Sequence, residues 1–222
     1  MRMCRKLRRS GSPEISDISR ENVPDFRDVH VFEEEIILKR MKTKDLVLCA
    51  MFVALIAVGA FIKVPVPVVP FTLQFLFTML AGLLLGPGNG ALAVVIYIVL
   101  GLAGLPIFTQ GGGPSYIFQP SFGYIIGFAA AAYVTGRIAN EKSHPGYGRL
   151  LAANFIGLFI VYAFGMVYYY VISNFVLNTP IGLWPLFLYC FLLAVPGDIA
   201  LCILAAAIGK RMIPMIREGR LG

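Results

Sequence analysis

The chain has 222 residues, of which 58% are hydrophobic and only 14% are charged, whereas charged residues make up about 25% of an average soluble domain. This composition and a mean hydropathy of +0.79 exclude an ordinary soluble protein and indicate a membrane protein with several spans. The net charge of +7 does not indicate nucleic-acid binding, because such binding needs basic residues clustered on one face of a folded domain.

The first 40 residues differ in composition from the rest of the chain. They contain nine Lys or Arg and eight Asp or Glu, whereas residues 41–222 contain ten basic and four acidic residues. We therefore predict a disordered polar extension over residues 1–40 and a membrane-embedded domain over residues 41–222. The basic start resembles a signal peptide, but no apolar segment follows closely enough for cleavage. Met41 directly precedes the first apolar run and is an alternative translation start, which would make the extension non-native.

Six apolar segments follow and predict an all-α bundle of six transmembrane helices. Their ranges are Leu46–Ile62, Phe71–Leu85, Ala91–Leu105, Phe122–Ile138, Leu150–Leu177 and Trp184 to about Ile213.

Small residues stand at a helix-packing spacing in two of these segments. Ala50 and Ala54 lie in the first, and Gly123 and Gly127 lie in the fourth. A spacing of four residues puts small side chains on one helix face, where another helix can approach closely in lipid. For the two alanines, the partner is either another helix of this chain or a helix of a second protein.

The charge pattern predicts the orientation in the membrane. An even number of spans puts both termini on one side, and nearly all basic residues fall on that side. They are Lys42, Lys44, Arg137, Lys142, Arg149, Lys210, Arg211, Arg217 and Arg220. The opposite side has only Lys63. By the positive-inside rule, both termini are predicted to be cytoplasmic and the protein to lie in the cell membrane.

Three connections are expected on the outer side. Lys63–Pro70 contains three prolines, which exclude a helix and predict an extended lid or an interfacial connector. Pro106–Pro120 contains three consecutive glycines, which either bring backbone N–H groups to a ligand or form a flexible turn. The third connection is Asn178–Leu183. The polar candidates of the second connection are Gln110, Gly111, Gly112, Gly113, Ser115 and Tyr116.

Asp198 is the central candidate for a binding site. It lies within the last apolar segment, after Pro196 and Gly197, where a carboxylate costs roughly 2.5–3.5 kcal/mol on insertion scales. No Lys or Arg occurs between positions 64 and 136 or between 150 and 209, so no cation in a neighbouring span pairs with it. A ligand with two adjacent N–H donors would satisfy this carboxylate. Gln74 and Asn154 are further polar candidates in the spans, and Asn154 either joins two helices or faces the pocket.

The sequence contains no pattern for catalysis. HExxH, GxSxG and Walker A motifs are absent, and there is no second intramembrane Asp. Cys49, Cys190 and Cys202 lie in apolar runs without zinc-ligand spacing, so we expect no metal and no disulfide. The residues leave two further interpretations open. One is a proton-coupled carrier for a small solute, and the other is a membrane scaffold whose Asp198 pairs with a partner helix.

Four motifs together resemble the BioY family, the biotin-specific membrane subunit (S component) of energy-coupling-factor (ECF) transporters. They are Val-Pro-Phe-Thr-Leu-Gln (69–74), Gly-Leu-Pro-Ile-Phe into Gly-Gly-Gly (104–113), Pro-Ser-Phe-Gly-Tyr-Ile-Ile-Gly-Phe (120–128) and Pro-Gly-Asp (196–198). The resemblance covers residues 41–222 and implies a six-helix bundle that captures biotin from outside. It also implies a transmembrane coupling protein and a pair of ATPases as partners, with no cofactor.

The resemblance assigns roles to individual residues. Asp198 matches the acid that binds the ureido ring of biotin, and Ala50 and Ala54 match small residues that contact the coupling protein. This chain departs from the family at Leu201 and Cys202, where a lysine often stands one turn after the acid. A basic residue for the biotin carboxylate is also missing from the outer halves of the spans except for Lys63. Lys63, Gln110 and the backbone N–H groups of Gly111–Gly113 are therefore expected to bind the carboxylate.

Overall fold

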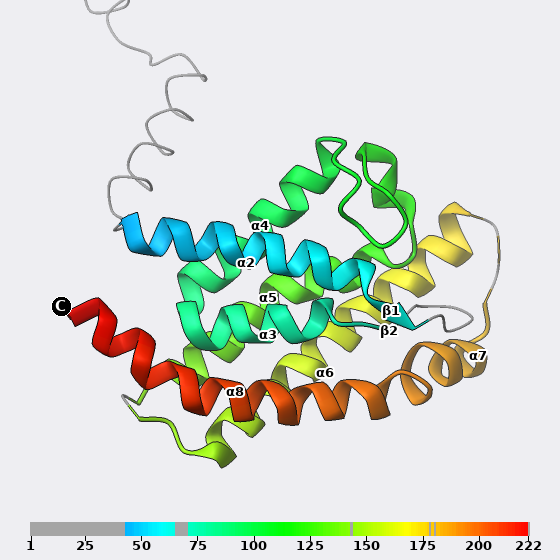
Figure 1. Cartoon of the computed structure of the whole chain (residues 1–222). Coiled ribbons are helices and arrows are strands. Elements are labelled where there is room, and N and C mark those ends of the chain that lie inside the picture. Colours follow the sequence, from blue (N-terminus) through cyan, green and yellow to red (C-terminus); the bar gives the residue numbers. More distant parts are fainter. Residues whose placement is uncertain (1–42, 65–70, 143, 178, 180, 222) are drawn as a thin grey trace, which may run out of the picture. The chain divides into compact units, whose positions relative to one another are not determined.

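The computed structural model describes residues 43–64, 71–142, 144–177, 179 and 181–221 (Figure 1). This part of the chain is helical apart from one pair of two-residue strands. The elements are α2 (Thr43–Phe61), β1 (Lys63–Val64), β2 (Phe71–Thr72), α3 (Gln74–Leu85), α4 (Pro87–Leu102), the 3₁₀ turn η1 (Pro114–Phe118), α5 (Phe122–Asn140), α6 (Tyr147–Val171), the π-helical turn η2 (Ile172–Val176), α7 (Leu183–Phe187), the π-helical turn η3 (Leu188–Leu192) and α8 (Val195–Leu221).

Four helical segments in the described part are long and apolar enough to cross a membrane. They are Thr43–Phe61, Phe122–Asn140, Tyr147–Val176 and Trp184–Ile216. Helices α3 and α4 are apolar but have 12 and 16 residues, fewer than the roughly 20 that a perpendicular span requires. The prediction of a helical membrane protein is confirmed. The count of six spans stays a prediction.

Helices α3 and α4 are short because of how they begin and end. Phe71 and Thr72 pair with Val64 and Lys63 in an antiparallel ladder, so α3 starts only at Gln74. It ends at Gly86, whose φ of 89° is a left-handed backbone conformation that favours glycine. Pro87 then occupies the first turn of α4, where its missing N–H costs nothing. Within the predicted lid, residues 65–70 lie outside the described part of the chain.

The helices pack around α5. It runs against α6, α3 and α4, while α8 covers α3 and α6, and α2 covers α3 and α4. At one end of this bundle, called the loop end from here on, lie β1, β2, the 103–121 loop and α7 (right in Figure 1). At the opposite end lie the start of α2, the α5–α6 connection and the end of α8. This grouping agrees with the predicted division into two membrane sides.

Glycines allow close contact between helix backbones. A Cβ on Gly82 of α3 would lie 2.5 Å from the carbonyl oxygen of Ala132 on α5, and one on Gly136 of α5 would lie 2.7 Å from the carbonyl oxygen of Gly82. The predicted packing role of Gly123 and Gly127 is confirmed, since a Cβ at either position would press on α6.

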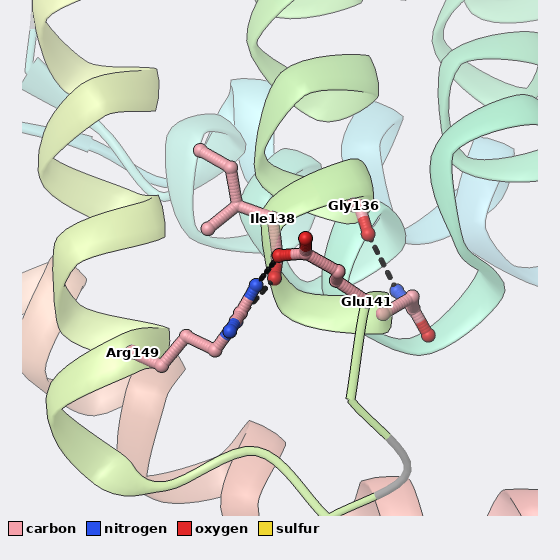
Figure 2. Close-up of polar contacts among 5 residues, drawn as sticks. Gly136, Ile138, Glu141 and Arg149 are labelled. Atoms are coloured by element: carbon pink, nitrogen blue, oxygen red, sulfur yellow. Dashed lines mark hydrogen bonds and ion pairs between the residues drawn. The ribbon is translucent and has the colours of Figure 1, made fainter.

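Polar contacts fix the α5–α6 connection at the end away from the loops (Figure 2). The Arg149 side chain pairs with Glu141 and its Nε donates a hydrogen bond to the Ile138 carbonyl at 2.7 Å. The Asn140 amide donates to the carbonyls of Gly136 at 2.8 Å and Leu83 at 3.3 Å. Glu141 is 72% exposed, so the ion pair itself contributes little. The bonds to backbone carbonyls hold the ends of α3, α5 and α6 together.

Aromatic rings hold the 103–121 loop against the bundle. Phe108 is fully buried and packs between Tyr97 at 5.3 Å and Tyr116 at 4.5 Å between ring centroids. Tyr116 in turn meets Phe122 at 6.3 Å. The loop is therefore packed by its own side chains, and the alternative of a flexible turn is not what the structure shows.

Substitution of Gly82 by alanine should destabilise the protein, because the added Cβ meets backbone that cannot rotate away. Overpacking of this kind costs about 1–3 kcal/mol. Gly88→Ala is the matched control, since a Cβ at that position would meet no heavy atom within 4 Å. Thermal unfolding in detergent should show a lower Tm for Gly82→Ala alone. Equal Tm values for the two variants would contradict the close contact between α3 and α5.

Candidate functional site

A cavity lies among α3, α5, α6, the η3–α8 segment and the 103–121 loop. Asp198 and five aromatic side chains form part of its wall. The space open to the centre of a water molecule is about 70 Å³, several times what one water needs. Its lining residues are Thr72, Gln74, Phe75, Thr109, Tyr116, Ser121, Tyr124, Ile125, Phe128, Val161, Tyr162, Cys190, Ala194 and Asp198.

Asp198 lies just after a change in helix geometry. The π-helical turn η3 ends at Leu192, and α8 begins at Val195 with Pro196 in its first turn. Proline at that position has no N–H to offer to the carbonyl four residues earlier. The Asp198 N–H donates to the Ala194 carbonyl at 3.2 Å. Its carboxylate is 9% exposed and lies on the cavity wall.

Tyr162 of α6 is the partner of the buried carboxylate. Its Oη donates a hydrogen bond to Asp198 Oδ2 at 2.5 Å. Tyr162 also packs edge-on against Phe191 at 5.2 Å, which restricts its ring. No Lys or Arg among the described residues lines the cavity. A neutral hydroxyl therefore supports the acid, and Asp198 Oδ1 remains for a ligand.

Tyr124 of α5 belongs to the same polar group. Its ring meets Tyr162 edge-on at 6.0 Å and 89°, and its hydroxyl lies near the Cys190 thiol and Asp198. The Tyr124 hydroxyl is buried and forms no hydrogen bond of ordinary geometry with a described residue. Asp198, Tyr162, Tyr124 and Cys190 form what we call the acid cluster.

A second polar group, called the hydroxyl cluster, lines the cavity from the side of the 103–121 loop. The Tyr116 hydroxyl lies 3.0 Å from Thr109 Oγ1 and 3.5 Å from Ser121 Oγ. Gln74 is 2% exposed, and its Nε2 has no hydrogen-bond partner among the described residues. Lys63 supports this cluster from outside, because its Nζ donates to the Thr109 carbonyl at 3.1 Å.

Apolar side chains complete the wall. They come from three helices and are Phe75, Ile125, Phe128 and Val161, with Ala194 before α8. A cavity with an acid in one polar cluster, neutral donors in another and hydrocarbon around them suits a small ligand with polar groups and an apolar body.

The structure brings together three of the residues that the sequence predicts for the site. Asp198, Gln74 and Tyr116 line the cavity, and Lys63 reaches it through Thr109. The other candidates lie elsewhere. Gln110 and Ser115 are exposed, and Gly111 and Gly112 do not line the cavity. Asn154 is fully buried and donates a hydrogen bond to the Cys202 carbonyl at 3.0 Å. This bond joins α6 to α8.

Sequence reasoning did not single out Tyr162, Tyr124, Thr109 or Ser121 as site residues. A tyrosine hydroxyl in an apolar helix needs a polar partner, and this requirement was the available signal for Tyr162. It does not tell which helix supplies the partner. Asp198 lies 36 residues later in the chain, so only the packing of α6 against α8 pairs them.

Comparison with known proteins gives consistent matches. The model of the BioY family matches residues 34–218. A protein named probable biotin transporter BioY from Lysinibacillus sphaericus is 47% identical over 184 residues, which cover 83% of this chain and 94% of that protein. Biotin transporter BioY from Thermotoga maritima is 41% identical over 124 residues, which cover 55% of this chain and 72% of that protein. The crystal structure of the S-component for biotin from an ECF-type ABC transporter matches with a TM-score of 0.63 at 29% identity, covering 78% of this chain and 94% of that one.

Loss of the Tyr162 hydroxyl should destabilise the protein even without ligand. Tyr162→Phe leaves Asp198 Oδ2 as a buried acceptor without a donor, which costs about 1–3 kcal/mol. Tyr133→Phe, on a residue that is 45% exposed, should change stability by less than about 0.5 kcal/mol. In an Asp198→Ala background, Tyr162→Phe should cost much less, since the pair is already broken. Thermal unfolding in detergent measures the wild type, the three single variants and the double variant. If Tyr162→Phe costs the same stability with and without Asp198, the two side chains are not coupled.

Proposed function

Because the chain belongs to the BioY family, we propose that it captures biotin and supports its uptake as the substrate-specific subunit of an energy-coupling-factor transporter. The observation that carries this proposal is the Asp198 carboxylate on the wall of a largely apolar cavity, held through one oxygen by Tyr162. A buried acceptor of this kind strongly disfavours a ligand that offers no N–H group, because the acceptor would then stay unpaired.

The chemistry of biotin fits the two polar clusters. Its ureido ring offers N–H groups to Asp198 Oδ1, and its sulfur ring and aliphatic chain suit the apolar wall. We infer that the hydroxyl cluster binds the biotin carboxylate, with Gln74 Nε2 as a buried donor and Lys63 behind Thr109. This assignment replaces Gln110 and the glycines 111–113, which the sequence favoured, since those residues do not line the cavity.

Uptake requires partners that this chain does not supply. The sequence has no Walker A motif, so separate ATPase subunits would provide the energy and a transmembrane coupling protein would connect them. Ala50 and Ala54 are both exposed on α2, beside the exposed apolar residues Val47, Met51 and Val58. A small-residue face open to the outside of the bundle suits contact with another membrane helix.

The proposed topology has six spans and both termini in the cytoplasm. In it, α3 and α4 each cross the membrane and are joined by the tight turn at Gly86. Two observations support it. The turn at Gly86 lies at the end of the bundle that carries Arg137, Lys142 and Arg149, and the bias of basic residues favours that end as cytoplasmic. Thr72, Thr109 and Tyr116 of the loop end line the cavity, and this end would then open to the outside of the cell membrane.

Equilibrium binding to the purified protein tests the proposal. Biotin should bind, and other vitamins without a cyclic urea should bind far more weakly. Absence of detectable biotin binding by a folded protein would overturn the proposed function. Uptake that depends on a proton gradient and not on ATP would instead favour a proton-coupled carrier.

Asp198→Asn should lower the affinity for biotin by at least about tenfold. The amide oxygen can still accept from Tyr162, but the NH₂ group then faces a ligand N–H. Loss of a hydrogen bond to a charged acceptor costs about 1.5–3 kcal/mol, and about 1.4 kcal/mol corresponds to a factor of ten. Stability without ligand should not fall, because a neutral amide is cheaper to bury than a carboxylate. A destabilised variant with unchanged affinity per folded molecule would remove Asp198 from the binding site.

Tryptophan at position 50 or 54 should abolish transport and leave biotin binding intact. An indole on this face prevents the close approach of a partner helix, while the cavity lies elsewhere in the bundle. Co-purification with the coupling protein and uptake in cells measure the first effect, and binding to the isolated subunit measures the second. Variants that still co-purify like the wild type would contradict the contact. Val167→Trp is the matched control, since it puts an indole on an exposed position of a different helix, α6.

A further inference from the structure

The Tyr124 hydroxyl is a buried donor with no strong acceptor free to bind it in the acid cluster. Tyr124 is 7% exposed, and none of the described residues forms a hydrogen bond of ordinary geometry with its Oη. Buried tyrosine hydroxyls usually have a partner, and leaving one unpaired is unfavourable. An unpaired hydroxyl on a cavity wall is therefore a group that a ligand can satisfy.

The neighbours of Tyr124 do not supply a strong acceptor. The Tyr124 hydroxyl interacts with the Cys190 thiol, and sulfur is a weak acceptor. Asp198 is also near, but its Oδ2 already accepts from Tyr162. The ring of Tyr124 is held edge-on against Tyr162, and a Cβ on Gly165 would collide with it. Packing on both sides therefore keeps the hydroxyl at this position.

The acid cluster thus presents an acceptor beside a donor. Asp198 Oδ1 can accept one N–H, and Tyr124 Oη can donate to an oxygen next to that N–H. Cyclic ureas and amides carry this complementary pair on one edge. One turn after Asp198 on α8, Leu201 has no side-chain donor and the Cys202 thiol is only a weak one.

We propose that Tyr124 donates a hydrogen bond to the ureido oxygen of the ligand and thereby selects a carbonyl oxygen at that position. This inference rests on the proposed function, since it assigns a further group at the same site. Tyr124 then acts as a specificity-determining residue, and a ligand without an acceptor at that position loses the hydrogen bond from its hydroxyl.

Two ligands and one pair of variants test the proposal. Biotin has a ureido oxygen, whereas 2-iminobiotin carries a hydrogen-bearing nitrogen in its place. Tyr124→Phe should weaken biotin binding about tenfold and should weaken 2-iminobiotin binding clearly less. Tyr133→Phe is the matched control, since it removes a hydroxyl from an exposed residue of the same helix. It should change the affinity for neither ligand.

Stability separates this role from a structural one. Removal of an unpaired hydroxyl should leave the Tm without ligand unchanged or higher in Tyr124→Phe. A lower Tm together with equal losses for both ligands would overturn the proposal, and so would unchanged biotin affinity. Wild-type protein that is folded but binds no biotin would instead overturn the proposed function, and this inference with it.

Discussion

The hydrogen bond from Tyr162 to Asp198 is the interaction on which the rest of the site depends. A carboxylate inside an apolar bundle is unfavourable unless it is paired or hydrated. This chain pairs it with a neutral hydroxyl at 2.5 Å, and no cation among the described residues lines the cavity. The acid therefore keeps an unshared oxygen for a ligand, which a bidentate arginine would have occupied.

Much of the remaining architecture serves to keep that pair in place. Tyr162 lies on α6 and Asp198 on α8, and Asn154 joins these helices one to two turns away through the Cys202 carbonyl. At the end away from the loops, the contacts of Arg149 and Asn140 with backbone carbonyls hold the α5–α6 connection. Glycine contacts bring α5 close to α3 and α6. Close packing of this kind leaves the side chains on the wall few alternative positions.

Apart from Asp198, the polar groups that line the cavity are neutral. Its donors are hydroxyls and one amide, on Tyr124, Tyr116 and Gln74, and the nearest described lysine acts through the Thr109 carbonyl. Neutral donors are less costly to bury than cations, which suits a cavity inside a membrane protein. They also discriminate by geometry, because an unmatched ligand leaves them unpaired.

The sequence by itself determined the class of protein and the approximate place of its long apolar helices, and it singled out Asp198 as the central candidate for a site. Hydropathy and apolar length identify spans because lipid demands them locally, and a rare intramembrane acid stands out for the same reason. The sequence also supported the family through its motifs, but it misplaced the starts of two helices: α3 begins at Gln74 and not at Phe71, and α4 begins at Pro87 and not at Ala91. Only the tertiary structure decided the partners of Asp198 and the place of Gln110, which is exposed. Tyr162 and Asp198 are 36 residues apart, and no local pattern states which faces of two helices meet. The depth of a loop residue depends likewise on distant rings, such as Tyr97 against Phe108.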